Sequence, residues 1–219
     1  MDFEKTFLLL RDFASIVQLF AAIAGTIFYA KYKRTFLRYF LVLLWYTVLN
    51  ELLGIFIRDN ISSHNAIVYN IYYVINFSLL FLIFKNHLLS KVYRKWSLLF
   101  LLIYLISFSI NGFFENYIVE FQSFPYIIAA CSLIIIIAFY FIEILNSTRV
   151  LNVKKNLLFW ISIGLLIYYI GNIPFRILRN YYSNSTDLSI LFLINIVLTI
   201  IMNFCFIIGF IWSDKKQPY

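Results

Sequence analysis

The chain has 219 residues, of which 63% are hydrophobic and 13% are charged, and its formal net charge is +8. Soluble domains are about 45–50% apolar and about 25% charged, so this composition indicates an integral membrane protein. The positive charge lies in short segments between long apolar stretches and not on a separate module. It therefore predicts membrane topology and argues against nucleic acid as a partner.

Seven apolar stretches predict seven transmembrane helices, because a spanning helix needs about 20 mostly apolar residues. A transmembrane β-barrel would show ~10-residue segments that alternate between apolar and polar residues. The run Leu133–Ala138 is instead apolar on every face. The predicted spans are Phe13–Ala30, Phe36–Ile57, Ile67–Phe84, Trp96–Phe113, Pro125–Leu145, Leu157–Phe175 and Leu188–Trp212. We thus expect an all-α, seven-helix membrane bundle that forms one domain over residues 1–219.

The distribution of Lys and Arg predicts which way the bundle points. If alternate connections lie on opposite sides, one side receives Lys31, Lys33, Arg34, Arg38, Lys85, Lys91, Arg94, Lys95, Arg149, Lys154, Lys155, Lys215 and Lys216. The other side receives only Lys5, Arg11, Arg58, Arg176 and Arg179. Basic residues in short loops stay in the cytoplasm. We expect an outside N-terminus, a cytoplasmic C-terminus and a multi-pass location in the inner (plasma) membrane.

Glu51 is the charged residue that lies most clearly within a predicted span. Charged groups at membrane depth are costly, and they usually face the bundle interior or a cavity. Arg58, on the same helix, and Arg176, at the end of the sixth span, are candidate partners for its carboxylate. Two roles stay open, namely a hydrogen-bonded clasp between helices and a group that binds a ligand or a proton.

Further polar groups occur at a similar depth in other spans, mostly in the predicted outer half of the membrane. We expect an outward-opening pocket between the second, third, sixth and seventh spans, widened by a kink near Pro174. Its predicted lining is Glu51, Tyr73, Asn76, Tyr168, Asn172 and Asn195. Largely apolar walls with a few placed polar groups are typical of small-molecule sites. The alternative is that each polar residue bonds one helix to its neighbour.

Small residues predict places where helices approach closely. Ala21 and Gly25 in the first span, and Gly164 and Gly171 in the sixth, recur at helical spacing. Small side chains at such positions let helix backbones pack tightly in membranes.

The chain shows no catalytic constellation. Its two histidines, His64 and His87, fall in connections on opposite sides of the predicted membrane. The Cys/His spacing of zinc sites, the phosphate-binding loop and the nucleophile elbow are all missing. The sequence therefore predicts no enzyme, no cofactor and no metal site.

Two strings resemble the seven-helix membrane modules that precede bacterial sensor histidine kinases, namely Phe159–Asn172 and Ile194–Asn203. The resemblance implies sensing. Sensor kinases continue into a kinase domain, whereas this chain ends at Tyr219, so we expect output through a cytoplasmic signalling partner. The first functional hypothesis is a receptor-like module that binds a small apolar or amphipathic ligand, or responds to the lipid bilayer.

Two other functions stay open. One is a small transporter with a three-plus-one-plus-three helix plan, because the first three and last three spans run in matching directions around the fourth. The other is a membrane accessory or effector protein of a defence or stress system.

Overall fold

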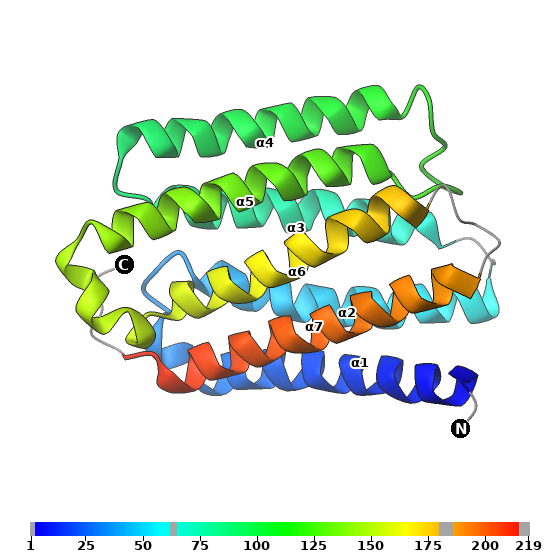
Figure 1. The fold of residues 1–219 in the computed structure, drawn as a ribbon, viewed down its shortest axis with the longest axis horizontal. Coiled ribbons are helices and arrows are strands. Elements are labelled where there is room, and N and C mark those ends of the chain that lie inside the picture. Colours follow the sequence, from blue (N-terminus) through cyan, green and yellow to red (C-terminus); the bar gives the residue numbers. More distant parts are fainter. Residues whose placement is uncertain (1–2, 62–64, 180–185, 215–219) are drawn as a thin grey trace. The chain divides into compact units, whose positions relative to one another are not determined.

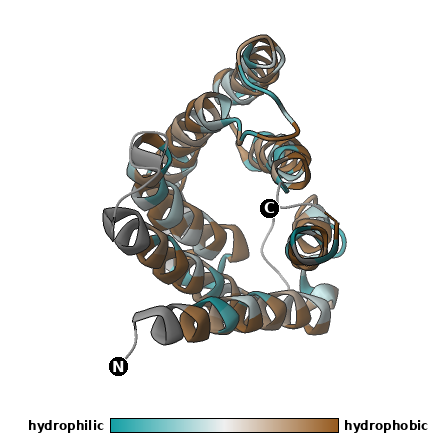
Figure 2. Cartoon of the chain, turned by 90° about the vertical axis from the view of Figure 1, so that its right-hand side faces the viewer, coloured by the Kyte–Doolittle hydropathy of each residue, from teal (hydrophilic) through white to brown (hydrophobic). Residues whose placement is uncertain are grey.

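Helices cover almost all of the apolar sequence in the computed structural model, which describes residues 3–61, 65–179 and 186–214 (Figure 1). The seven α-helices are α1 (Phe3–Ile27), α2 (Arg38–Asn60), α3 (Ala66–His87), α4 (Lys91–Asn111), α5 (Ser123–Leu145), α6 (Leu157–Arg179) and α7 (Thr186–Trp212). Each contains a segment of 20 to 23 residues that is long and apolar enough to cross a membrane, and apolar residues predominate along the helices in Figure 2. The described residues contain no strand. The prediction of an all-α fold with seven membrane-length helices is confirmed.

Several helix ends differ from the predicted ends of the spans. α1 begins ten residues earlier than expected and ends at Ile27, where the chain enters the short 3₁₀-helix η1 (Tyr29–Lys31). α4 ends at Asn111, two residues before the predicted Phe113. α6 continues through Pro174 to its end, so this proline does not terminate the helix. A second 3₁₀ segment, η2 (Thr148–Lys155), precedes α6. His64, Lys215 and Lys216 lie outside the described residues.

The helices belong to two compact units. Unit 1 comprises residues 1–33 and 149–219, and therefore α1, α6 and α7. Unit 2 comprises residues 34–148 and therefore α2 to α5.

In unit 1, glycines allow α6 and α7 to pack closely. A Cβ atom added at Gly164 would lie 2.9 Å from the backbone oxygen of Met202, and one at Gly171 would lie 2.5 Å from the Leu198 side chain. The third glycine of this contact, Gly209 on α7, faces the Trp160 side chain in the same way. The close approach predicted for the Gly164 and Gly171 face is therefore confirmed.

The end of α7 is held by the segment that follows α1. The Lys31 ammonium donates to the carbonyl oxygens of Phe210 and Ile211 at 2.8 and 2.9 Å. A cation at this position satisfies carbonyls that have no partner within the helix and complements the helix dipole. The buried Tyr32 hydroxyl donates to the Gly25 oxygen at 2.5 Å. Burial, reinforced by Tyr29, raises the pKa of Tyr32 above its ordinary value.

In unit 2, α3 packs against each of the other three helices. Its large fully buried side chains include Phe77, Leu80, Phe81, Ile83 and Phe84. α4 is the least buried of these four helices, because Ser97, Tyr104 and Asn111 are its only buried residues. Most of the α4 surface is thus left to apolar surroundings.

Glu143 fixes the connection between α3 and α4. Its carboxylate accepts from the backbone N–H groups of Leu89 and Ser90 at 2.7 and 2.8 Å. Ser90 then caps α4 by accepting from Val92 N–H at 3.2 Å. Glu143, which stands near the end of the apolar run of α5, was not predicted from the sequence, unlike Glu51.

We expect Gly164→Val to destabilise the protein, because the valine side chain would collide with the α7 backbone. Overpacking of this kind costs about 1–3 kcal/mol. The measurement is thermal unfolding in detergent, with Ile167→Val on the same helix as the control, since Ile167 is 38% exposed. Equal melting temperatures for the two variants would contradict the close α6–α7 contact.

Candidate functional site

The α2–α3 hairpin brings a carboxylate and a tyrosine together within the apolar part of unit 2. Glu51 lies on α2, about two turns before the helix ends, and Tyr69 lies in the first turn of α3. The Tyr69 hydroxyl donates to Glu51 Oε2 at 3.3 Å, which is longer than the usual 2.7–2.8 Å of an O–H···O bond. Both residues are half-buried. The prediction that Glu51 has a polar partner is confirmed, and that partner had not been named from the sequence.

A glycine makes this contact sterically possible. A Cβ atom at Gly54, three residues after Glu51, would lie only 2.7 Å from the Tyr69 hydroxyl oxygen. The Gly54 carbonyl in turn accepts from the side-chain amide of Asn65 at 3.2 Å. Asn65, which immediately precedes α3, thereby ties the start of that helix to α2. The phenol ring of Tyr69 can therefore lie directly against the α2 backbone.

Tyrosines further along α3 make separate contacts with α2 and α5. The hydroxyls of Tyr72 and Thr47 lie 3.1 Å apart. The ring of Tyr73 meets the Tyr126 ring of α5 edge to face, with centroids 5.0 Å apart. The tyrosines of α3 thus contact two neighbouring helices.

The connection between α4 and α5 lies against the same end of α3. The Tyr69 ring contacts the Phe121 ring, with centroids 5.9 Å apart. Asn70, the next residue, is fully buried. Its side chain donates to the carbonyls of Tyr117 and Glu120 at 2.8 and 2.9 Å, and it accepts from the backbone N–H of Gln122 at 3.1 Å.

Asn70 is a residue that the sequence analysis missed. Its signal was present but ambiguous, since it is one more polar residue in a span that already contained three tyrosines and Asn76. Its partners are mostly backbone groups of a distant connection, which no spacing rule identifies.

Unit 1 contains its own polar contact between helices. The amide of Asn172, a fully buried residue of α6, donates to the side-chain oxygen of Asn195 on α7. Along α7 the Thr199 hydroxyl donates to the Asn195 carbonyl at 2.9 Å, and the Asn203 amide donates to the Thr199 carbonyl at 2.8 Å. The Asn172–Asn195 bond therefore joins two helices, whereas Thr199 and Asn203 bond within one.

The six residues predicted to line one pocket are divided between the units. Three of them, Glu51, Tyr73 and Asn76, belong to unit 2, and Asn76 is buried there. The other three are Tyr168, Asn172 and Asn195 of unit 1. Within unit 1, Asn172 and Asn195 are brought into contact, and the half-buried Tyr168 packs edge to face on Tyr169 with centroids 5.2 Å apart. The pocket that all six would share stays a prediction.

The Glu51–Tyr69 cluster has the chemistry of a hydrogen-bond acceptor site in an apolar setting. A carboxylate there can accept a bond from a tyrosine or from an amine or hydroxyl of another molecule, and it can hold a proton. Among the described residues, no group of three His, Cys, Asp or Glu side chains is placed to hold a metal ion. Comparison of the chain with protein-family models, curated proteins and solved structures finds no match.

We expect Tyr69→Phe to lower the free energy of unfolding by about 0.6–1.7 kcal/mol, which are the average and the largest values measured for hydrogen bonds between membrane helices. Glu51→Leu should cost at least as much, because it leaves the Tyr69 hydroxyl without this acceptor. In Glu51→Gln the amide oxygen can still accept the bond, so the loss should be smaller.

The control for this series is Tyr93→Phe, which preserves the stack of Tyr93 on Phe139 at a centroid distance of 4.3 Å. Unfolding is followed by circular dichroism in detergent, and a double-mutant cycle of Tyr69→Phe with Glu51→Leu isolates the pair. Additive losses would show that the two side chains do not interact.

Proposed function

We propose that the protein is a receptor-like membrane module and that the Glu51–Tyr69 contact is the element that responds to its ligand. The observation that carries this proposal is a carboxylate on a membrane-length helix that accepts a long, 3.3 Å bond from a tyrosine on the next helix. Ionisable groups at membrane depth are rare and usually functional.

The ligand class follows from what surrounds the carboxylate. A molecule that reaches Glu51 between α2 and α3 needs an apolar body, because the neighbouring side chains Leu52, Leu53 and Phe56 are apolar and exposed. It also needs a hydrogen-bond donor, because an ionised carboxylate only accepts. Such a ligand competes with the Tyr69 hydroxyl for the same oxygen atoms. Long-chain alcohols and amines have this chemistry.

Displacement of Tyr69 offers a way to transmit binding. Its ring lies against Phe121 of the α4–α5 connection, so a rotated Tyr69 would press on or release that connection. The effect would reach α4 and α5 by movement of packed groups. A partner at the other end of the helices would then detect the change in helix position.

The orientation and location of the module are part of the proposal. Basic residues cluster at the end of unit 2 that carries the α3–α4 connection, with Lys85, Lys91, Arg94 and Lys95. By the positive-inside rule, this end faces the cytoplasm and the Glu51–Tyr69 end faces outward. We therefore place the protein in the plasma membrane with its N-terminus outside, a ligand arriving from outside, and a signalling partner on the cytoplasmic side.

The grouping of helices favours a receptor over a parallel-repeat carrier. A three-plus-one-plus-three carrier plan would group the first three spans together and the last three together. The compact units instead combine α1 with α6 and α7, and α2 with α3, α4 and α5.

A thermal-shift measurement tests the ligand class. We expect a long-chain alcohol or amine to raise the melting temperature of the purified protein, and a fatty acid of the same chain length to have little effect, because its carboxylate repels Glu51. Glu51→Leu should abolish the shift. Glu143→Gln, a carboxylate change at the other end of unit 2, should preserve it. A shift that persists undiminished in Glu51→Leu would refute Glu51 as the ligand group.

Cysteine labelling tests the orientation. In a background with Cys131 and Cys205 replaced by alanine, we introduce Asn60→Cys at the end of α2 or Asn146→Cys just after α5, two exposed positions. An impermeant thiol reagent should label Asn60→Cys in intact cells and Asn146→Cys only after permeabilisation. The opposite pattern would mean that the bundle is inverted.

A further inference from the structure

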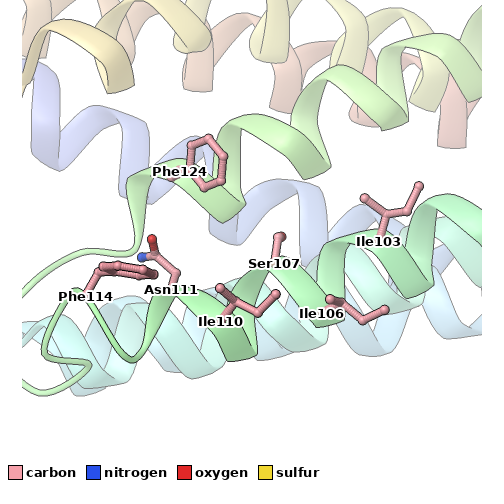
Figure 3. Close-up of a pocket in the computed structure, with 7 residues that line it drawn as sticks. All are labelled: Ile103, Ile106, Ser107, Ile110, Asn111, Phe114 and Phe124. Atoms are coloured by element: carbon pink, nitrogen blue, oxygen red, sulfur yellow. The ribbon is translucent and has the colours of Figure 1, made fainter.

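An open-sided hollow of about 320 Å³ lies at the end of α4, between α4, the α4–α5 connection and the start of α5. Its walls are Ile103, Ile106, Ser107, Ile110, Asn111, Phe114 and Phe124. Figure 3 shows the α4 side chains in succession along one side, with Phe114 beside Asn111 and Phe124 across from them. All seven residues belong to unit 2.

The polar groups in this wall are already used. The Ser107 hydroxyl donates to the carbonyl of Tyr104, on its own helix, at 2.7 Å. The Asn111 amide donates both to Glu115 Oε2 at 2.7 Å and to Gln122 Oε1 at 2.6 Å. Two acceptors occupy the two hydrogens of that amide group. The wall therefore presents an apolar surface to any occupant.

The connection beside the hollow carries large exposed apolar side chains next to polar groups that bond within the protein. The exposed Glu120 accepts from the Asn116 N–H at 2.9 Å, and the half-buried Tyr117 donates through its hydroxyl to the Phe108 carbonyl at 2.8 Å. Its large apolar side chains point outward, with Phe113 88% exposed and Phe114 79% exposed. Neighbouring apolar side chains with so much exposed surface favour an apolar environment at this end of α4.

The hollow is continuous with the apolar surface of α4. Leu102 and Ile106 are 54% and 50% exposed on a helix long and apolar enough to cross a membrane, so their surroundings are acyl chains. The exposed Ile110 and Phe114 extend this surface to the end of α4. A chain that lies along α4 therefore meets no polar barrier before the hollow.

We propose that this hollow binds one acyl chain of a membrane lipid, which lies along the end of α4 against Ser107 and Phe124. The occupant is a chain and not a head group, because the wall has no spare donor for a phosphate or a carboxylate. The site is separate from the Glu51–Tyr69 cluster, and it stands whether or not the protein is a receptor.

Photo-cross-linking tests the site. The full-length protein is reconstituted into phosphatidylcholine vesicles that contain a phosphatidylcholine with a diazirine on one acyl chain, and the adducts are mapped by mass spectrometry after irradiation. We expect adducts to concentrate on residues 103–114 and on Phe124. The equally apolar and exposed Leu98, Leu99 and Leu102 of the same helix should carry severalfold fewer. Adducts spread evenly along α4 would overturn the proposal.

Variants that fill the hollow supply the matched comparison. Ile106→Trp should reduce the adducts around the hollow severalfold, and Ser107→Leu is a smaller filling variant in case the tryptophan disturbs the fold. Leu102→Trp, at a similarly exposed position one turn away, should leave them unchanged. Melting temperatures check that all three variants are folded. Equal adduct yields in Ile106→Trp, Ser107→Leu and Leu102→Trp would refute a bound chain in the hollow.

The same samples distinguish a second copy of the protein as the occupant. With Phe124→Cys in a background that lacks Cys131 and Cys205, oxidation should leave the protein monomeric. An efficient disulfide between two copies at this position, together with weak lipid adducts, would assign the hollow to a protein contact and overturn the lipid proposal.

Discussion

The scarcity of water in the hydrocarbon interior governs the whole structure, because each polar group placed there has to find its partner within the protein. Helices solve this problem for the backbone. Several hydroxyls solve it by bonding back to a carbonyl four residues earlier on their own helix, namely those of Ser15, Thr26, Ser162 and Thr199. Such residues carry little information about neighbouring helices. The informative polar groups are those that reach another segment, and Glu51, Asn70 and Asn172 do so.

The same constraint explains what could be predicted from the sequence. The seven helices were predictable because the hydropathy of a long apolar run depends only on the residues within the run. Only the ends of the helices needed correction. For example, α4 ends at Asn111, and Tyr117 packs directly against the following Gly112, where a Cβ would lie 2.1 Å from the tyrosine oxygen. That contact comes from a connection several residues later, so hydropathy could not reveal it.

Partners were much less predictable than helices. Glu51 was identified because a lone acid in an apolar run is conspicuous, but its bond to Tyr69 depends on the register of α2 against α3. Asn70 and Glu143 were missed because both act mainly on backbone groups of distant connections. Every residue has backbone groups, so the type of a residue does not show whether its backbone bonds to such a side chain. The grouping of the helices was equally hard to predict, because α1 packs with α7 although the two helices lie at opposite ends of the sequence.

The structural and the functional roles considered for Glu51 are compatible in energetic terms. A bond between membrane helices is worth about 0.6–1.7 kcal/mol, and coupling between a ligand and a conformational change is typically about 1–3 kcal/mol. A donor ligand that replaces the Tyr69 hydroxyl breaks one hydrogen bond to Glu51 and forms another. The free energies of these two bonds nearly cancel. In the proposed mechanism, the Glu51–Tyr69 contact is both the structural bond between α2 and α3 and the element that a ligand opens.

The neighbouring Asn70 sets the limit of such a movement. Its side chain makes three hydrogen bonds to the α4–α5 connection, whereas the hydrogen bond of Tyr69 to Glu51 is long, at 3.3 Å. Tyr69 can therefore change position at far lower cost than Asn70, and the connection would shift as a body while it stays attached to α3. That connection also forms one wall of the hollow beside α4. A change at Glu51 and the packing of an acyl chain against Phe124 would therefore both act on the α4–α5 connection. A membrane lipid would in this way bias the position from which the connection responds.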